Sequence, residues 1–198
     1  MNFKSKIFFL LSGLCLAVNV NAQTVFSKEG KPTGEPLAKP MVMKPFIEFT
    51  IARALPPLKL FTLNGESVDL NKYKGKLLIL NVWGTWCTPC IREIPQLIEL
   101  QKKFKDSDIV IQGVSIDTSV TKIPEFLKKH KGEEFQTWSD PTESTGNILP
   151  LEVVPTNLII DGEGNLVGYL PGYLPWDDKA VVPFLESLAK KYAKPNYK

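Results

Sequence analysis

The residues best suited to chemistry in this sequence are two cysteines, Cys87 and Cys90, within the stretch NVWGTWCTPCIREIP. A pair at this spacing can be a disulfide that stabilises the fold, part of a metal site, or a dithiol that is repeatedly oxidised and reduced. The local sequence favours the third use. The apolar run GKLLILNVWG predicts a buried strand, and the residues after it predict a helix that begins near Cys87.

A helix N-terminus stabilises a thiolate, because its unpaired N–H groups and partial positive charge face the sulfur. We therefore expect Cys87 to be the nucleophile, with a pKa below the ~8.5 of a free thiol. Cys90 lies one helical turn further on and is expected to be the resolving thiol, which releases a substrate held as a mixed disulfide.

The other uses of a cysteine pair fit the chain poorly. A structural zinc ion needs about four Cys or His ligands, and after removal of a signal peptide the chain would hold two cysteines and one histidine, His130. A covalently attached haem needs a histidine after the second cysteine, where this chain has Ile91. A structural disulfide across so short a loop would restrict the unfolded chain little. We expect no metal and no cofactor beyond the redox-active disulfide Cys87–Cys90.

Residues 1–22 have the pattern of a secretory signal peptide. Lysines precede the 12-residue apolar run Ile7–Val18, and small residues follow it up to Ala22. The run is shorter than the ~20 residues that a membrane-spanning helix needs. We expect cleavage and a periplasmic location, with an uncleaved signal that tethers the protein to the membrane as the alternative. A lipid anchor on Cys15 is disfavoured, because lipidated cysteines usually follow a small residue.

Composition and charge predict one soluble domain, but they exclude few classes of function. The chain has 198 residues, of which 43% are apolar, which suits one α/β domain with an appendage. Residues 1–22 hold two lysines and no acids, so the net charge of +3 falls to +1 without them. That balance does not favour nucleic acid as a partner. We place a proline-rich linker or N-terminal extension over residues 23–54 and the folded domain over residues 55–198.

The remaining pattern predicts a central mixed sheet covered by helices on both faces, with an antiparallel pair at one end. The dipeptide Asn64-Gly65 predicts a β-hairpin between about Leu58 and Leu70. Phe46–Arg53 is apolar enough to pack as a strand or a helix. Further elements follow the cysteines in the order strand 108–117, helix 120–130, strand or loop 134–140, short helix 145–149, two strands around 161–164, and helix 176–192.

Three features together resemble the thioredoxin superfamily: WCTPC after a buried strand, Pro95 in the following helix, and VVPT at Val153–Thr156 before another strand. The resemblance implies an α/β, thioredoxin-like fold with a central mixed β-sheet flanked by helices. It also implies that Pro155 is preceded by a cis peptide bond beside the cysteines. The backbone of Val154 would then bind an extended substrate segment.

Within that superfamily, residues 55–188 are similar to the TlpA/ResA/CcmG-like group of extracytoplasmic thiol-disulfide oxidoreductases. The similarity rests on LNVWGTWCTPCIREIP, the preceding hairpin and NKYKGK, and VTKIPEFLKKH matches the group's helical insertion. It implies a periplasmic reductase of protein disulfides, with cytochrome c maturation-type substrates. Its partners would be protein thiols and disulfides and a membrane electron donor of the DsbD or CcdA type.

The same resemblance suggests roles for residues around the pair. Asn81 stands where cytoplasmic thioredoxins have a buried aspartate, so another group must assist deprotonation. Glu93 matches an acid beside the active site of the ResA-like group, and we expect it to tune the thiol pKa and to exchange a proton with Cys90. The alternative is a surface glutamate in the first turns of the helix. Trp86 is expected to cover Cys87 and contact substrate, whereas Trp83 suits the core equally well.

Other functions remain as alternatives. A disulfide oxidase or isomerase uses the same chemistry, but those proteins carry a large helical insertion or a dimerisation domain for which this chain has little room. A copper-delivery protein of the Sco type would need three residues between its cysteines. A peroxiredoxin would need Pro-x-x-x-Thr-x-x-Cys, a pattern that the residues before Cys87 lack.

Overall fold

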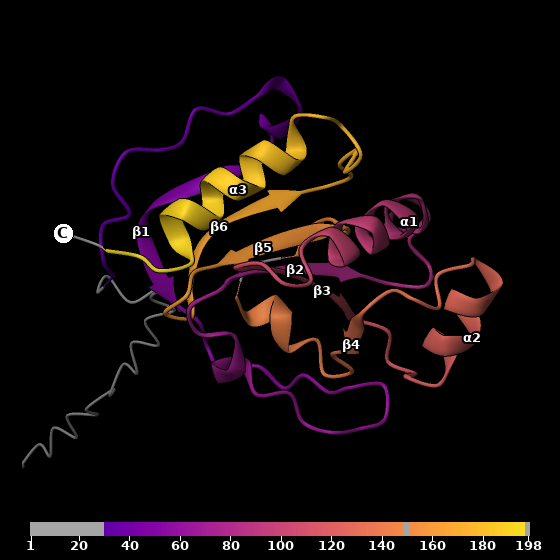
Figure 1. Ribbon diagram of the computed structural model, residues 1–198. Helices are drawn as coiled ribbons and strands as arrows, with labels where there is room; N and C mark the ends of the chain where they lie inside the picture. The colour runs from indigo at the N-terminus through magenta and orange to yellow at the C-terminus, as the bar shows by residue number, and fades with distance from the viewer. Residues whose placement is uncertain (1–29, 149–150, 197–198) are drawn as a thin grey trace, which may run out of the picture.

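The computed structural model of the chain describes residues 30–148 and 151–196. The signal peptide expected over residues 1–22 lies outside this part of the chain. The described residues form a six-stranded sheet in the order β1-β6-β5-β2-β3-β4 (Figure 1). Its strands are β1 Ile47–Ala54, β2 Leu77–Trp83, β3 Ile109–Ser115, β4 Thr137–Ser139, β5 Thr156–Ile160 and β6 Asn165–Pro171.

The sheet is mixed, as the sequence predicts. Strands β2, β3 and β4 run parallel to one another, whereas the pairs β2–β5, β5–β6 and β6–β1 are antiparallel. The parallel step from β2 to β3 needs a crossover, which helix α1, Thr88–Lys103, provides. The antiparallel step from β5 to β6 needs only a tight turn, and Gly164 supplies its positive φ of +93°.

Strand β2 lies at the centre of the fold, and all seven of its residues are buried. Leu77 and Ile79 face one hydrophobic cluster, while Leu78 and Leu80 face the other. A strand that is apolar on both sides can occupy only a central position with both faces covered. The C-terminal end of β2, and with it the cysteine pair, therefore lies between the ends of the neighbouring strands rather than at an outer strand.

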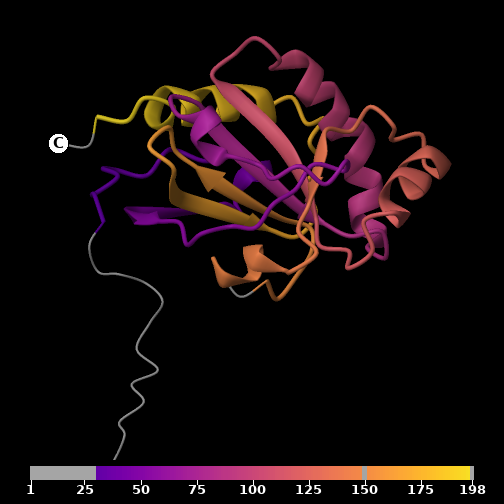
Figure 2. The same cartoon turned by 90° about the horizontal axis from the view of Figure 1, so that it is seen from below.

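Helices α1 and α3, Val181–Tyr192, pack on the same face of the sheet (Figure 1). Helix α2, Lys122–Lys129, lies beside α1 at the β4 end of the molecule (Figures 1 and 2). Its buried residues Ile123 and Leu127 join the cluster that α1 and α3 form with the sheet. The predicted insertion helix therefore extends the α1 face and lies close to the start of α1.

The opposite face differs from the expectation of helices on both sides. Within the described residues it is covered by the segment 55–74 and by two 3-10 helices, η2 Leu70–Tyr73 and η3 Ser144–Asn147. The physical reason lies in the segment's sequence, because Pro56-Pro57 and Asn64-Gly65 interrupt any helix there.

The hairpin expected between Leu58 and Leu70 is reduced to a turn closed by one bridge, between Phe61 and Ser67. Gly65 makes the turn with a φ of +87°. On its other side Phe61 pairs with Ser139 of β4, through hydrogen bonds of 2.9 and 2.8 Å, so the turn is attached to the edge of the sheet.

Residues 30–46, here called the strap, lie against the domain. The strap is joined to β1 by an isolated bridge between Pro32 and Ile51, and it contains the 3-10 helix η1, Met41–Met43. Phe46–Arg53, for which the sequence left strand and helix open, falls within strand β1 apart from its first residue. Residues 47–54, assigned from the sequence to the N-terminal extension, thus form an edge strand of the sheet.

A partly buried ion pair fixes the strap to the last helix. Glu48 of β1 contacts the Nζ atom of Lys191 at 2.6 Å, and the exposed fractions of these side chains are 2% and 17%. The same carboxylate accepts hydrogen bonds from the hydroxyl of Tyr192 and the backbone N–H of Leu37. Lys191 also donates to the carbonyl of Glu35 in the strap. The strap, β1 and α3 are therefore held at one charged centre.

Candidate active site

Cys87 and Cys90 lie just beyond the C-terminal end of β2 and are joined by a disulfide with a Cα–Cα distance of 5.3 Å. Both are buried, with exposed fractions of 4% and 1%. Cys87 is the N-cap of α1, and its sulfur accepts a hydrogen bond of 3.3 Å from the backbone N–H of Cys90. In the dithiol form the same N–H and the helix N-terminus would stabilise negative charge on Cys87.

The segment VVPT, far away in the sequence, reaches the disulfide. The peptide bond between Val154 and Pro155 is cis, as the resemblance implies. The carbonyl oxygen of Val154 lies 3.5 Å from the sulfur of Cys87. Gly172 donates its N–H to the carbonyl of Pro155, which ties this segment to the end of β6. An extended peptide that pairs with Val154 would therefore pass directly over Cys87.

The loop before the cysteines is held by an aspartate that the sequence reasoning missed as a site residue. Asp117 accepts hydrogen bonds from the N–H and the hydroxyl of Thr85, at 2.9 and 2.6 Å, and from Ser115 at 2.7 Å. The sequence does contain a signal for this contact. Asp117 follows β3, and the C-terminal ends of the parallel neighbours β2 and β3 lie side by side. The contact fixes Thr85 two residues before Cys87.

The two tryptophans of the motif have different environments. Trp83 is fully buried and donates its indole N–H to the hydroxyl of Thr137. Trp86 is 64% exposed, which is unusual for so large an apolar side chain. Its indole lies so close to Gly84 that a Cβ there would approach within 2.8 Å. Trp83 is a core residue, and Trp86 offers an aromatic surface next to Cys87.

Glu93 is fully buried, which excludes the alternative of a surface glutamate. It lies three residues after Cys90, within α1. One carboxylate oxygen accepts a hydrogen bond of 2.7 Å from the backbone N–H of Leu174, and the other accepts one of 3.2 Å from the side chain of Asn81. The loop after β6 and strand β2 thus both contribute donors to this carboxylate.

Asn81 is oriented by a second buried amide, Asn157, which the sequence reasoning did not select. The amide nitrogen of Asn81 donates to the side-chain oxygen of Asn157 at 2.9 Å as well as to Glu93. With acceptors on both sides, Asn81 keeps its NH2 group toward the carboxylate. In the described part of the chain, two buried donors nearby meet no acceptor at hydrogen-bonding distance: the amide nitrogen of Asn157, and the indole nitrogen of Trp176, which still lies close enough to Glu93 to favour its ionised form.

Comparison with known proteins agrees with this geometry. Residues 51–168 match the family model described as AhpC/TSA family. The chain belongs to the AhpC/TSA family. Within this family it is of the TlpA/ResA/CcmG-like kind, because its curated relatives include proteins named thiol-disulfide oxidoreductase ResA. That of Bacillus subtilis (strain 168) is 32% identical over 109 residues, which cover 55% of this chain and 60% of that protein. That of Bacillus thuringiensis (strain Al Hakam) is 30% identical over 122 residues, covering 62% and 70%.

Solved structures confirm the thioredoxin-like fold of this AhpC/TSA member. The pneumococcal exposed lipoprotein thioredoxin from Streptococcus pneumoniae aligns with a TM-score of 0.58 and 26% identity, covering 66% of this chain and 98% of that one. A thiol:disulfide interchange protein from Bacteroides sp. aligns with a TM-score of 0.55 at 22% identity, covering 69% and 88%. The latter supports the fold alone.

The carboxyl group of Glu93 titrates near neutral pH in this AhpC/TSA protein. Burial raises its pKa from 4.5 to about 7. The hydrogen bonds from Leu174 and Asn81, the nearby Trp176 indole and the charge of Arg92 lower the pKa, but less than burial raises it. Near pH 7 Glu93 can therefore both hold and release a proton, whereas a glutamate in water is almost fully ionised at that pH.

This raised pKa predicts that stability falls as pH rises. Between about pH 4.5 and 7 the folded protein binds a proton at Glu93 that the unfolded chain has released, so this stabilisation is present at low pH and lost above about pH 7. Glu93→Gln should flatten the profile, reducing the difference in unfolding free energy between pH 5 and pH 8 by about 2–3 kcal/mol. Urea unfolding of the oxidised protein at both pH values measures this. The exposed Glu186→Gln is the matched control, and equal profiles in both variants would refute the assignment.

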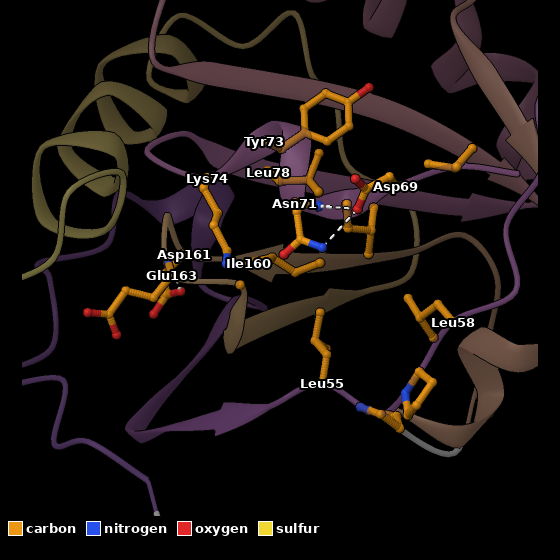
Figure 3. A pocket seen from close by; sticks show the side chains of 15 residues that line it. Leu55, Leu58, Asp69, Asn71, Tyr73, Lys74, Leu78, Ile160, Asp161 and Glu163 are labelled. Carbon is orange, nitrogen blue, oxygen red and sulfur yellow. Dashed lines mark hydrogen bonds between the residues drawn. The ribbon is translucent and has the colours of Figure 1, made fainter.

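The AhpC/TSA domain also has a surface pocket at the other end of β2 (Figure 3). Its volume is about 340 Å³, and its lining includes the apolar residues Leu55, Leu58 and Leu78. Asp69, which also lines it, accepts two hydrogen bonds from Asn71. No cysteine or histidine lines it, so it offers no group for thiol exchange.

Two further observations concern the described residues of this AhpC/TSA chain. None of the helices in residues 30–148 and 151–196 is both long and apolar enough to span a bilayer. Within the same ranges no three His, Cys, Asp or Glu side chains are grouped so that they could hold a metal ion.

Proposed function

We propose that this protein reduces disulfide bonds in other proteins outside the cytoplasm, with Cys87 as nucleophile and Cys90 as resolving thiol. The observation that carries the proposal is the environment of the Cys87 sulfur, which lies at the N-terminus of α1 and 3.5 Å from the carbonyl oxygen of Val154. The first contact favours a thiolate, and the second supports our proposal that the Val154 backbone binds a substrate segment in a strand-like manner. The ResA-type relatives, named as thiol-disulfide oxidoreductases, support the same chemistry.

The reaction proceeds by two exchanges. In the dithiol form, the thiolate of Cys87 attacks one sulfur of the substrate disulfide, forms a mixed disulfide and expels the other sulfur as a thiolate. Cys90 then loses its proton and attacks the sulfur of Cys87, which restores the Cys87–Cys90 disulfide and releases the second substrate thiol. Two electrons pass to the substrate, whose two sulfurs take up the proton lost by Cys90 and one proton from solvent, and a dithiol donor must return the electrons.

Glu93 is proposed to handle the proton of Cys90. It is buried with that thiol on the same helix, three residues away, and its pKa of about 7 lets it accept and return a proton near neutral pH. The donors on Leu174 and Asn81 stabilise the ionised carboxylate that is ready to accept the proton. Trp86, Val154 and Pro155 are proposed to bind the substrate segment.

The cellular setting is part of the proposal. The signal-like residues 1–22 support export to the periplasm, and one structural relative is an exposed lipoprotein. A reductase in an oxidising compartment needs electrons from elsewhere, so we propose a membrane donor of the DsbD or CcdA type. Cytochrome c maturation-type substrates are proposed from the ResA-like resemblance.

The direction of electron flow can be tested by the reduction potential of the Cys87–Cys90 pair. The mature protein is equilibrated with dithiothreitol or glutathione buffers, free thiols are trapped, and the two redox forms are separated. We expect a potential near the roughly −270 mV of thioredoxin. A value near the ~−120 mV of DsbA would mean that the pair donates its disulfide, and the oxidase alternative would replace the reductase.

A further inference from the structure

A groove of about 260 Å³ lies beside the disulfide, between the active-site loop and the insertion helix. Thr85 and Trp86 form the wall on the loop side, and Trp86 is the residue next to Cys87. The other wall belongs to α2, with Lys122, Glu125, Phe126 and Lys129. A substrate held at Cys87 therefore has this groove immediately to one side of its attacked sulfur.

The wall on α2 is one continuous face of the helix. Its four residues have the spacing i, i+3, i+4, i+7, which places them along a single stripe. The buried residues Ile123 and Leu127 lie on the other side and attach the helix to the core. The stripe is therefore held in place by packing, while its side chains remain open toward Trp86.

The charges of the groove are unbalanced. Two lysines flank one glutamate, and no ion pair among the described residues involves any of the three. Five other lysines in the described chain do pair with carboxylates, at distances between 2.6 and 3.5 Å. Glu125 offsets one of the two positive charges, so the stripe has a net charge of +1, and Lys122 and Lys129 are available to pair with an acidic group brought in by a partner.

The size of the groove limits what can enter it. Its volume is about 260 Å³ and it is open to solvent along its length, so it can receive a short peptide segment. Phe126 and the exposed Trp86 provide apolar surface in the groove. Lys122 and Lys129, at the two ends of the stripe, provide positive charge. A short peptide segment with one acidic side chain matches both the volume and the charge.

We propose that this groove selects protein substrates that carry an acidic residue close to the attacked cysteine, with Lys122 and Lys129 as the specificity-determining residues. The inference rests on the proposed disulfide-exchange function and adds the class of substrate. Trp86 contacts the segment between the cysteine and the acidic residue. Helix α2, which resembles the insertion of the ResA-like group, then selects substrates by their charge.

The test uses two peptides, each a disulfide-linked pair, that differ only by Glu or Gln near the cysteine. The wild-type dithiol protein should reduce the Glu peptide about fivefold faster in kcat/KM at low salt, as expected for one exposed charge pair, and less so at high salt. Lys122→Gln combined with Lys129→Gln should abolish the preference. Lys128→Gln, on the same helix outside the groove, is the matched control and should keep it.

Reduction of a small uncharged disulfide separates the two proposals. If both variants reduce it at the wild-type rate and the double variant still prefers the Glu peptide, the groove proposal is wrong while the exchange function stands. An absence of preference in the wild-type protein would overturn it equally. If the wild-type protein reduces neither the peptides nor the small disulfide, the proposed function itself fails, and the groove proposal fails with it.

Discussion

Cys87→Ser is expected to lower the rate of disulfide exchange by about 10³-fold or more, because a serine hydroxyl at the start of α1 does not ionise near neutral pH. Cys90→Ser should act differently, since Cys87 can still attack. That variant should accumulate a mixed disulfide with its substrate and release product slowly. The measurement is single-turnover reduction of a disulfide-linked peptide, with the trapped adduct identified by its mass.

The two variants control for each other. Both cysteines are buried, and both substitutions remove the same disulfide, so a loss caused by misfolding would affect them alike. The proposed roles require that only Cys90→Ser forms the adduct. If Cys87→Ser formed it instead, the roles of nucleophile and resolving thiol would have to be exchanged.

Lys191→Met is expected to reduce the free energy of unfolding by about 3 kcal/mol, the largest effect on stability that we predict outside the hydrophobic core. The methionine would leave the carboxylate of Glu48 buried without its cationic partner, with only the Tyr192 hydroxyl and the Leu37 N–H as donors. It would also remove the donor to Glu35 in the strap. Denaturant unfolding monitored by tryptophan fluorescence measures this loss.

Lys190→Met is the matched control, because Lys190 is the neighbouring residue of α3 and is exposed. It should change stability by less than about 0.5 kcal/mol. Equal losses in the two variants would show that the Glu48–Lys191 ion pair does not determine the attachment of the strap. Proteolysis within residues 30–46 gives a second readout, since a released strap should be cut faster in Lys191→Met than in the control.

The parts of the site that could be predicted from the sequence are those in which local chemistry dictates structure. Three such features lie within a few residues: an apolar run that predicts a strand buried on both faces, a cysteine at the start of a helix, and the CxxC spacing. Together they predict a redox-active pair at the end of a central strand. The resemblance added Pro155, and the structure confirms both its cis bond and its place beside Cys87. The helix that carries Glu93 was predicted, but its burial depends on the loop that contributes Leu174, 81 residues away.

The contacts that could not be predicted join residues distant in the chain. Asn157 meets Asn81 only because β5 pairs with β2, and Glu48 meets Lys191 only because β1 lies beneath α3. Polar residues such as these carry no periodic signal, and their partners become visible only when strand order is known. The far face of the sheet shows the same limit, since its cover comes from irregular segments that have no periodic pattern.

The segments that lie against the outer strands also give the sheet a defined end on each side. At the β1 edge, Ala52 donates its N–H to the carbonyl of Lys31 in the strap, and Thr33 donates to Thr50. At the β4 edge, Phe61 exchanges two hydrogen bonds with Ser139. Unpaired strand edges invite other chains to add a strand and aggregate. Much of both outer edges is therefore already paired within the chain, which leaves less free edge onto which another polypeptide could add a strand.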